Sequence, residues 1–402
     1  MTTSGLRRFA PVATVFLLAP LIGEVLFGAI PLSRLPFGLL GVVGLYGGGA
    51  ILVREAVRRR RLGAAWLVVL GLAYGLIEEG TVLQSLFDQH YPGLDFLGSY
   101  GHWLGVNWVW LEFIVPYHAV FSIAIPVVIT ELLFPEQRDE AWVSSRGLLG
   151  VVVVFVTNAV LLARFQIGLF TSHAPQTSLG ANVGVALVAA GLIACALLAP
   201  TSRVRVADRP AASQRTIRLA GVLSGLAWFV GLRVLLIGDG KNAPAAVILL
   251  AGAAIAALAW WSIARVCSLR RAWGDAQAYA LVSGALPTSW LLGFVIAAVS
   301  GGNVVVNLIG QVLFGVLLFR GLSWLGAQVR RRASVPTLPS RSFETQSVPL
   351  SRLSHQHAPV ASSAGTGAAG RMPRSVSPPF PLDSRESGRP GLAADPDRGN
   401  QA

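Results

Sequence analysis

The chain has 402 residues, of which 53% are hydrophobic and 13% charged, and its formal net charge is +13. The basic residues lie in short segments between long apolar runs, and no basic–aromatic platform accompanies them, so nucleic acid is excluded as a partner. Basic segments that face an anionic membrane leaflet account for the charge. The two cysteines, Cys195 and Cys267, lack CxxC spacing. Disulfides and thiolate metal sites are therefore excluded as well.

Ten apolar stretches follow one another along residues 9–325, and most reach the ~20 residues that a helix needs to cross a bilayer. A transmembrane barrel would alternate polar and apolar residues, whereas runs such as 151–155 do not alternate. We therefore expect an all-α, polytopic transmembrane bundle over residues 1–332, with the lipid bilayer as its partner. The expected spans cover residues 9–31, 37–53, 63–87, 106–134, 147–165, 179–199, 218–237, 244–266, 279–299 and 303–325.

Arginine accumulates in every second gap between these spans. With a cytoplasmic N-terminus, 21 basic residues fall on the inner side and four on the outer side, Arg34, Arg164, Arg233 and Lys241. Such an asymmetry in short loops sets the orientation of a membrane protein. We expect both termini to be cytoplasmic and the 88–105 loop to be external. The strong preference for arginine over lysine favours a GC-rich bacterium, and hence the bacterial inner (plasma) membrane.

The composition changes at about residue 333, where serine, proline, glycine, alanine and arginine become dominant. A segment with so few large apolar residues cannot offset its ordering entropy by burial. Residues 333–402 are therefore expected to form a disordered cytoplasmic tail.

Ionisable and polar groups inside the expected spans are candidates for function, because a charge at the centre of a bilayer costs at least ~2.5–3.5 kcal/mol. All of those that we single out lie in the first five spans, and we expect a Glu/His site in the outer half of spans three to five. They are Glu24 in the first span, Glu78 and Glu79 in the third, Glu112, His118 and Glu131 in the fourth, and Asn158 in the fifth.

The Glu78–Glu79 pair and His118 are expected at similar depth in the membrane. The pair lies about 22 Å into a helix that enters from the cytoplasm, and His118 about 18 Å into the helix that returns, at 1.5 Å per residue. A buried carboxylate beside a histidine can activate water as a general base or can relay protons. It can also simply fix the register of two helices. We expect Glu79 and His118 to face one another or a shared water.

The expected outer loop carries Asp88, His90, Asp95 and His102, but their spacing matches no zinc motif such as HExxH. We therefore expect no metal and no cofactor. Prolines at positions 116, 126 and 287 are expected to kink the fourth and ninth spans.

The Glu78-Glu79 pair, His118 about forty residues later and Asn158 another forty on resemble the pattern of the CPBP intramembrane proteases, which include the CAAX-processing endopeptidases. The resemblance covers about residues 63–165. Leu83 stands where the family has arginine, Ile114 where it has phenylalanine and Val154 where it has a second histidine. The resemblance implies that Glu78 or Glu79 is the catalytic base and that His118 and Asn158 stabilise an oxyanion.

Three hypotheses for function follow from these residues. The first is a membrane protein of unassigned activity, such as a non-enzymatic scaffold. The second is a CPBP-like intramembrane protease. The third is a proton-linked transporter that uses Glu24, Glu78 and Glu131 as relay groups. A convergence of Glu78, Glu79 and His118 would favour a chemical site over a scaffold. The sequence names neither a substrate nor a protein partner.

Overall fold

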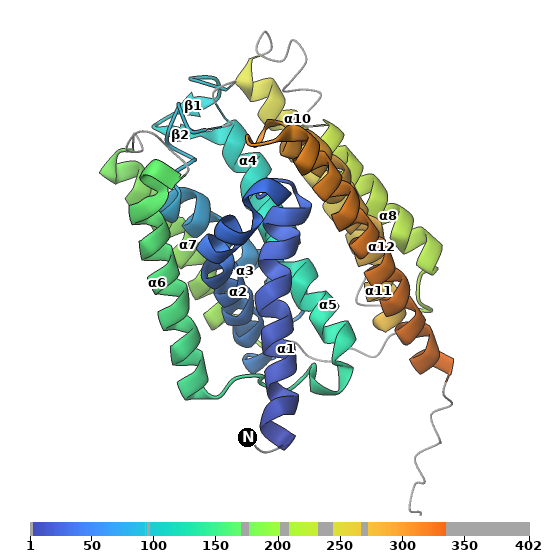
Figure 1. Ribbon diagram of the computed structural model, residues 1–402. Coiled ribbons are helices and arrows are strands. Elements are labelled where there is room, and N and C mark those ends of the chain that lie inside the picture. Colours follow the sequence, from blue (N-terminus) through green and yellow to red (C-terminus); the bar gives the residue numbers. More distant parts are fainter. Residues whose placement is uncertain are drawn as a thin grey trace, which may run out of the picture. The chain divides into compact units, whose positions relative to one another are not determined.

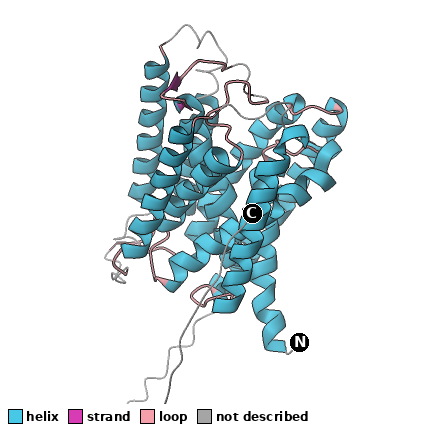
Figure 2. Cartoon of the chain, turned by 90° about the vertical axis from the view of Figure 1, so that its left-hand side faces the viewer, coloured by secondary structure: helices cyan, strands magenta, loops and turns pink. Residues whose placement is uncertain are grey.

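The computed structural model of the chain describes residues 3–92, 94, 97–169, 177–201, 209–231, 244–266 and 272–334. Within these residues the chain is almost entirely helical, and one small hairpin is its only sheet (Figure 2). Among the described residues, nine helical stretches are long and apolar enough to cross a membrane. The expected all-α, polytopic fold is therefore confirmed.

The first half of the chain contains α1 (Thr3–Pro20), η1 (Leu21–Leu26), η2 (Leu32–Arg34), α2 (Leu35–Arg59), α3 (Ala65–Leu76), η3 (Ile77–Val82), β1 (His102–Trp103), β2 (Val106–Asn107), α4 (Trp108–Tyr117), η4 (His118–Ala124), α5 (Ile125–Leu133) and η5 (Pro135–Gln137). The second half contains α6 (Ser145–Leu169), α7 (Leu179–Leu198), α8 (Gln214–Leu226), η6 (Ala227–Gly231), α10 (Ala245–Val266), α11 (Asp275–Val299) and α12 (Val304–Ser334). Figure 1 shows their arrangement.

Nine of the ten expected spans correspond to these membrane-length stretches. The other, residues 218–237, begins within α8 and η6, but residues 232–243 lie outside the described residues, so the count of ten stays a prediction. The expected tail also lies outside them, except that residues 333 and 334 complete α12. The second span is longer than expected, because α2 continues through its arginine-rich end to Arg59.

The third and fourth spans lie deepest in the bundle. In the fourth span, Trp108–Leu133, 72% of the most apolar stretch is buried, against 6% in the fifth, Ser145–Phe165. Gly71 on α3 permits this close packing, since a Cβ there would lie 2.7 Å from the Ala119 Cα on η4. Side chains on α3 and η4 are therefore shielded by their neighbours, and α6 instead turns apolar residues outward, as expected of a lipid-facing helix.

The segment between η3 and α4 folds back over one end of the bundle and includes the antiparallel β1–β2 hairpin. Figure 2 shows the hairpin at the opposite end of the bundle from the N-terminus. Gln84 has a φ of 58°, in the left-handed region that non-glycine residues rarely adopt. This conformation reverses the chain just after η3, so that Ser85 returns towards Glu79.

Candidate functional site

Three of the four predicted catalytic residues lie together in the core of the bundle. The His118 imidazole lies between two carboxylates, with Nε2 2.9 Å from Glu79 Oε1 and Nδ1 3.2 Å from Glu78 Oε2. Adjacent residues on a helix point about 100° apart, and here both carboxylates reach the same ring from different sides. All three side chains are almost completely buried. The cluster therefore lies inside the protein and does not face lipid.

Each polar group of the cluster is carried by a π-helical turn. Glu24 lies in η1, Glu78 and Glu79 in η3, and His118 begins η4. Prolines explain two of these irregular turns, because Pro20 immediately precedes η1 and Pro116 lies two residues before η4. A proline removes one helical hydrogen bond and clashes with the preceding turn. Single π turns inside α-helices are frequent at functional sites.

Two serines hold the ends of the Glu79–His118 pair. The Ser85 hydroxyl donates to Glu79 Oε2 and accepts a hydrogen bond from Trp110 Nε1 at 3.0 Å. On the other side of the ring, Ser122 Oγ lies 3.0 Å from His118 Nδ1. These contacts fix the rotation of the imidazole and leave both of its nitrogens in polar contact.

Three tyrosine rings, from the second, third and fourth spans, surround the His118 imidazole. The rings of Tyr46, Tyr74 and Tyr117 pack edge-on against His118, with centroids 5.9, 6.3 and 5.4 Å away. The Tyr46 hydroxyl donates to Glu24 Oε1. Glu24 is half-buried, whereas the other members of the cluster are buried. Glu24 and Tyr46 therefore connect the buried cluster with the less buried edge of the first span.

Two buried polar atoms beside His118, Glu78 Oε2 and the Tyr74 hydroxyl, have no hydrogen-bond partner within the described part of the chain. The contact from Glu78 Oε2 to Nδ1 is thus an ion-pair distance without hydrogen-bond geometry, and Nδ1 is directed at Ser122. One ligand atom each from Glu78, Glu79 and His118 lies within 4.8 Å of the others. The imidazole contacts Glu79 through Nε2, and Ser122 and Glu78 through Nδ1, and polar contacts at both nitrogens also suit proton exchange.

The other predicted site residues lie elsewhere. The Asn158 side chain bonds the backbone of α2, where it accepts from Leu45 N at 2.6 Å and donates to Gly41 O at 2.9 Å. It therefore joins α6 to α2 and makes no hydrogen bond with the cluster. Glu112, on α4, is half-buried and lies close to Gly252 on α10.

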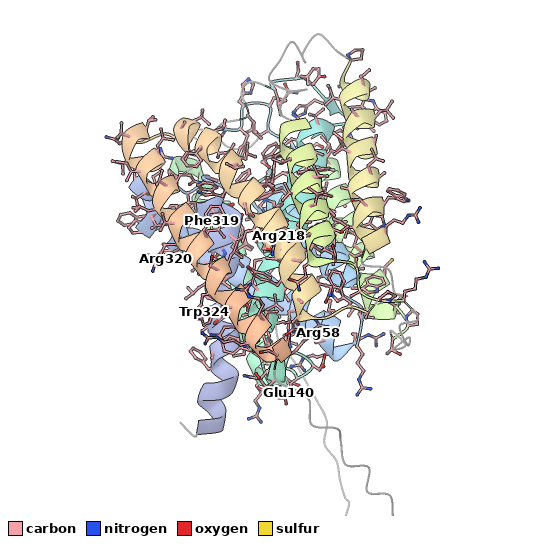
Figure 3. All side chains as sticks on the ribbon, turned by 90° about the vertical axis from the view of Figure 1, so that its right-hand side faces the viewer. Arg58, Glu140, Arg218, Phe319, Arg320 and Trp324 are labelled. Atoms are coloured by element: carbon pink, nitrogen blue, oxygen red, sulfur yellow. The ribbon has the colours of Figure 1, made fainter. Side chains whose placement is uncertain are left out.

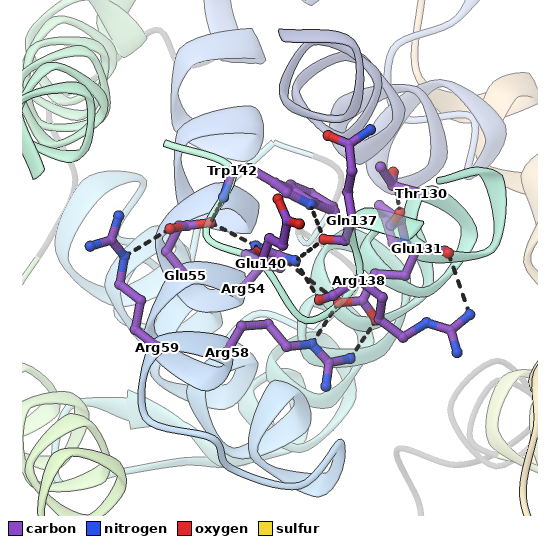
Figure 4. A network of polar contacts seen from close by, with 11 residues as sticks. Arg54, Glu55, Arg58, Arg59, Thr130, Glu131, Gln137, Arg138, Glu140 and Trp142 are labelled. Atoms are coloured by element: carbon purple, nitrogen blue, oxygen red, sulfur yellow. Dashed lines mark hydrogen bonds and ion pairs between the residues drawn. The ribbon is translucent and has the colours of Figure 1, made fainter. Parts of the chain in front are cut away.

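Glu131 belongs to a separate network at the end of the bundle where α2 terminates (Figure 4). Its carboxylate accepts from Arg58 Nε at 2.7 Å and lies 3.5 Å from Arg54 Nε. Arg54 is completely buried and donates to Glu55 at 2.8 Å. The same guanidinium stacks 3.7 Å from the centre of the Trp142 ring. Glu131 is therefore held by cations and does not take part in the Glu/His cluster.

Among its described residues, the expected outer loop contributes no group of three side chains that could hold a metal ion. Asp88 is buried and accepts from the His90 amide at 3.0 Å. His102 lies on β1, where burial lowers the pKa of its imidazole and the Asp88 charge opposes that shift. Asp95 lies outside the described residues.

The hydroxyl-bearing residues that surround the Glu/His cluster were not identified from the sequence. Ser85 lies beyond an irregular turn, and Tyr46 and Tyr74 lie in spans whose aromatic residues look like ordinary core. Only the π-helical turns and the return of the chain at Gln84 bring these hydroxyls to the carboxylates.

Comparison with known proteins identifies the family. No curated protein and no solved structure matches this chain. The model of an uncharacterized membrane protein family matches residues 14–320, and that range includes the Glu/His cluster and the nine membrane-length helices apart from the ends of the first and last. The chain therefore belongs to this uncharacterized membrane protein family.

Proposed function

We propose that the chain is a proton-linked membrane carrier in which Glu78, His118 and Glu79 bind and pass on a proton. The observation that carries this proposal is the imidazole between two carboxylates, 3.2 Å from Glu78 on one side and 2.9 Å from Glu79 on the other. A neutral imidazole accepts a proton at one nitrogen and can release one from the other.

The transfer balances without any other reactant. A proton on Glu78 moves to Nδ1 after a small rotation of the carboxyl group, and the proton on Nε2 moves to Glu79. Glu78 is then ionised, Glu79 is protonated and the imidazole is neutral with its proton on Nδ1. Reversal of both transfers restores the first state. Ser122 and Ser85 keep the ring and Glu79 aligned throughout.

Glu24 supplies a route to this relay. It is the half-buried carboxylate of the group, and it is bonded to Tyr46, whose ring packs against His118. The relay that we propose thus contains Glu24, Glu78 and Glu79. It does not use Glu131, whose carboxylate is neutralised by Arg58 at the end of α2.

The second candidate is an intramembrane hydrolase of the CPBP kind, and the 2.9 Å contact between Glu79 and His118 favours it. A general base must reach the water that it activates. Here Glu79 uses one oxygen for His118 and the other for Ser85, and Asn158 is engaged with α2. These contacts support a relay more than they support an oxyanion site.

A pH step on a solid-supported membrane tests the proposal without a known substrate. Purified protein in liposomes should give a transient charge displacement when the pH is changed, because protons enter the cluster. Glu78→Gln, Glu79→Gln and His118→Gln should each strongly reduce it, because each removes one proton-binding group of the relay. Glu112→Gln is the matched control, since it removes a carboxylate from the same span as His118. No displacement in the wild type, or equal displacement in all variants, would overturn the carrier.

A further inference from the structure

A second polar site lies between α8, α11 and α12, away from the Glu/His cluster. It is a cavity of about 340 Å³ whose lining includes Arg218, Ser283, Phe319, Ser323 and Arg330. Figure 3 labels Arg218, which lies on α8, and Phe319, which lies on α12. Arg218, Ser323 and Arg330 are exposed, so the cavity opens at the surface of the bundle.

Both arginines of the cavity lack an acidic partner among the residues that the structure describes. Arg218 Nε donates to Ser283 Oγ at 3.1 Å, and its guanidinium lies 6.0 Å from the Tyr279 ring. Neither Arg218 nor Arg330 forms an ion pair among the described residues, and the lining contains no carboxylate. Arg138, by contrast, pairs with Asp275 at 2.6 Å. Two guanidiniums without counter-charge at one opening form a site for an anion.

The position of the cavity along the helices matches the structure of a lipid. Arg218 is the fifth residue of α8 and Arg330 the fifth from the end of α12, so each lies about 6 Å from a helix end at 1.5 Å per residue. The basic loops predict that both ends face the cytoplasm. Phe319 lies eleven residues earlier on α12, about 16 Å deeper. The cavity is thus cationic at headgroup level and apolar towards the membrane interior.

We propose that this cavity binds an anionic phospholipid of the cytoplasmic leaflet. The phosphodiester would lie between the guanidiniums of Arg218 and Arg330, and the Ser323 hydroxyl can donate to it. An acyl chain would follow Phe319 into the bilayer. Basic pockets between transmembrane helices on the cytoplasmic side are suited to such headgroups. A free phosphate would satisfy the arginines but would leave the apolar part of the cavity unused.

The proposal is tested by lipid titration of the purified full-length protein in a neutral detergent, with native mass spectrometry to count bound lipids. Phosphatidylglycerol should bind, and phosphatidylcholine, whose headgroup carries no net charge, should bind much more weakly. Affinity for phosphatidylglycerol should fall about fivefold in Arg218→Gln or Arg330→Gln and about thirtyfold in the double variant. Arg320→Gln is the matched control, because Arg320 is exposed on α12 but does not line the cavity.

Three results would overturn the proposal. One is unchanged affinity in the double variant, and another is equal affinity for phosphatidylcholine. The third is displacement of the lipid by millimolar inorganic phosphate, which would assign the cavity to the free ion. Because all three substituted arginines are exposed, the variants should remain monodisperse, and a shift in size-exclusion profile would be seen before the titration.

Discussion

Replacing Arg54 with methionine should destabilise the protein more than any other single arginine substitution in α2. The guanidinium is completely buried, and it bridges the end of α2 to the segment that follows α5. It donates to Glu55 Oε1 at 2.8 Å and to three backbone oxygens, those of Gln137 at 3.2 Å, Arg138 at 2.6 Å and Glu140 at 2.7 Å. Methionine fills much of the same volume but donates no hydrogen bond.

The magnitude follows from what the substitution leaves behind. Glu55 is also fully buried, so it would retain a charge with only the partly exposed Arg59 as an ion-pair partner. Removal of one member of a buried ion pair costs about 3–5 kcal/mol, because the remaining charge stays desolvated. The carbonyls of Arg138 and Glu140 would lose the donor that Arg54 supplies, whereas Gln137 O would keep its bond from Trp142 Nε1. The stacking of Arg54 on Trp142 would be lost too.

The assay is reversible unfolding in mixed micelles with increasing dodecyl sulfate, followed by tryptophan fluorescence. Arg54→Met should lower the free energy of unfolding by about 3–5 kcal/mol. Arg59→Met is the control, since Arg59 contacts the same Glu55 but its side chain is 30% exposed, and it should cost less than about 1 kcal/mol. Equal losses in the two variants would refute the reasoning, because burial would then not determine the strength of this contact.

Further predictions concern the site, the loop and the helix packing. Glu79→Gln and His118→Ala should each lower the free energy of unfolding in the same assay. The double variant should lose less than the sum of the two single losses, because neither residue of the pair is then left without the other. Strictly additive losses would mean that the two residues do not interact. Burial lowers the pKa of His102, so a proton binds the opened loop more readily than the folded one. The protection factors of the hairpin amides, which correct for the slower intrinsic exchange at low pH, should therefore decrease as the pH falls below about 6.5, and this decrease should disappear in His102→Gln. Gly71→Ala should lower the free energy of unfolding by about 1–3 kcal/mol, because it forces the third and fourth spans apart. Gly191→Ala is the control and should be neutral, since a Cβ at that position meets open space. Equal effects in the two variants would mean that Gly71 is not a contact point.

The fold and the depth of the site were predictable from the sequence for a simple reason. Apolar length determines whether a helix crosses the membrane, and residue counting determines depth along it. Glu78 and Glu79 were placed about 22 Å from the cytoplasmic start of the third span, and His118 about 18 Å from the outer start of the fourth. Both positions lie inside the bundle, where the contact between Glu79 and His118 is found.

Rotation about the helix axis was not predictable in the same way, since it depends on packing and on the π turns. A π turn adds a residue to the helix and changes the direction of every side chain beyond it. Asn158, expected near the Glu/His pair, bonds α2 instead. The length of α2 was underestimated because arginines were assigned to a loop. The helix in fact carries Arg54 and Arg58 to Glu131, whose side chain offsets their charge.

The state of the two ring nitrogens of His118 tests the central claim most directly. Nitrogen-15 NMR of histidine-labelled protein in lipid bilayers, assigned with His118→Gln, reports whether each nitrogen is hydrogen-bonded. Ser122 already contacts Nδ1, so the relay is tested by the carboxylates: it predicts that Glu79→Gln shifts Nε2 and that Glu78→Gln shifts Nδ1. A free, unbonded nitrogen on His118, or a spectrum that neither substitution changes, would contradict the relay.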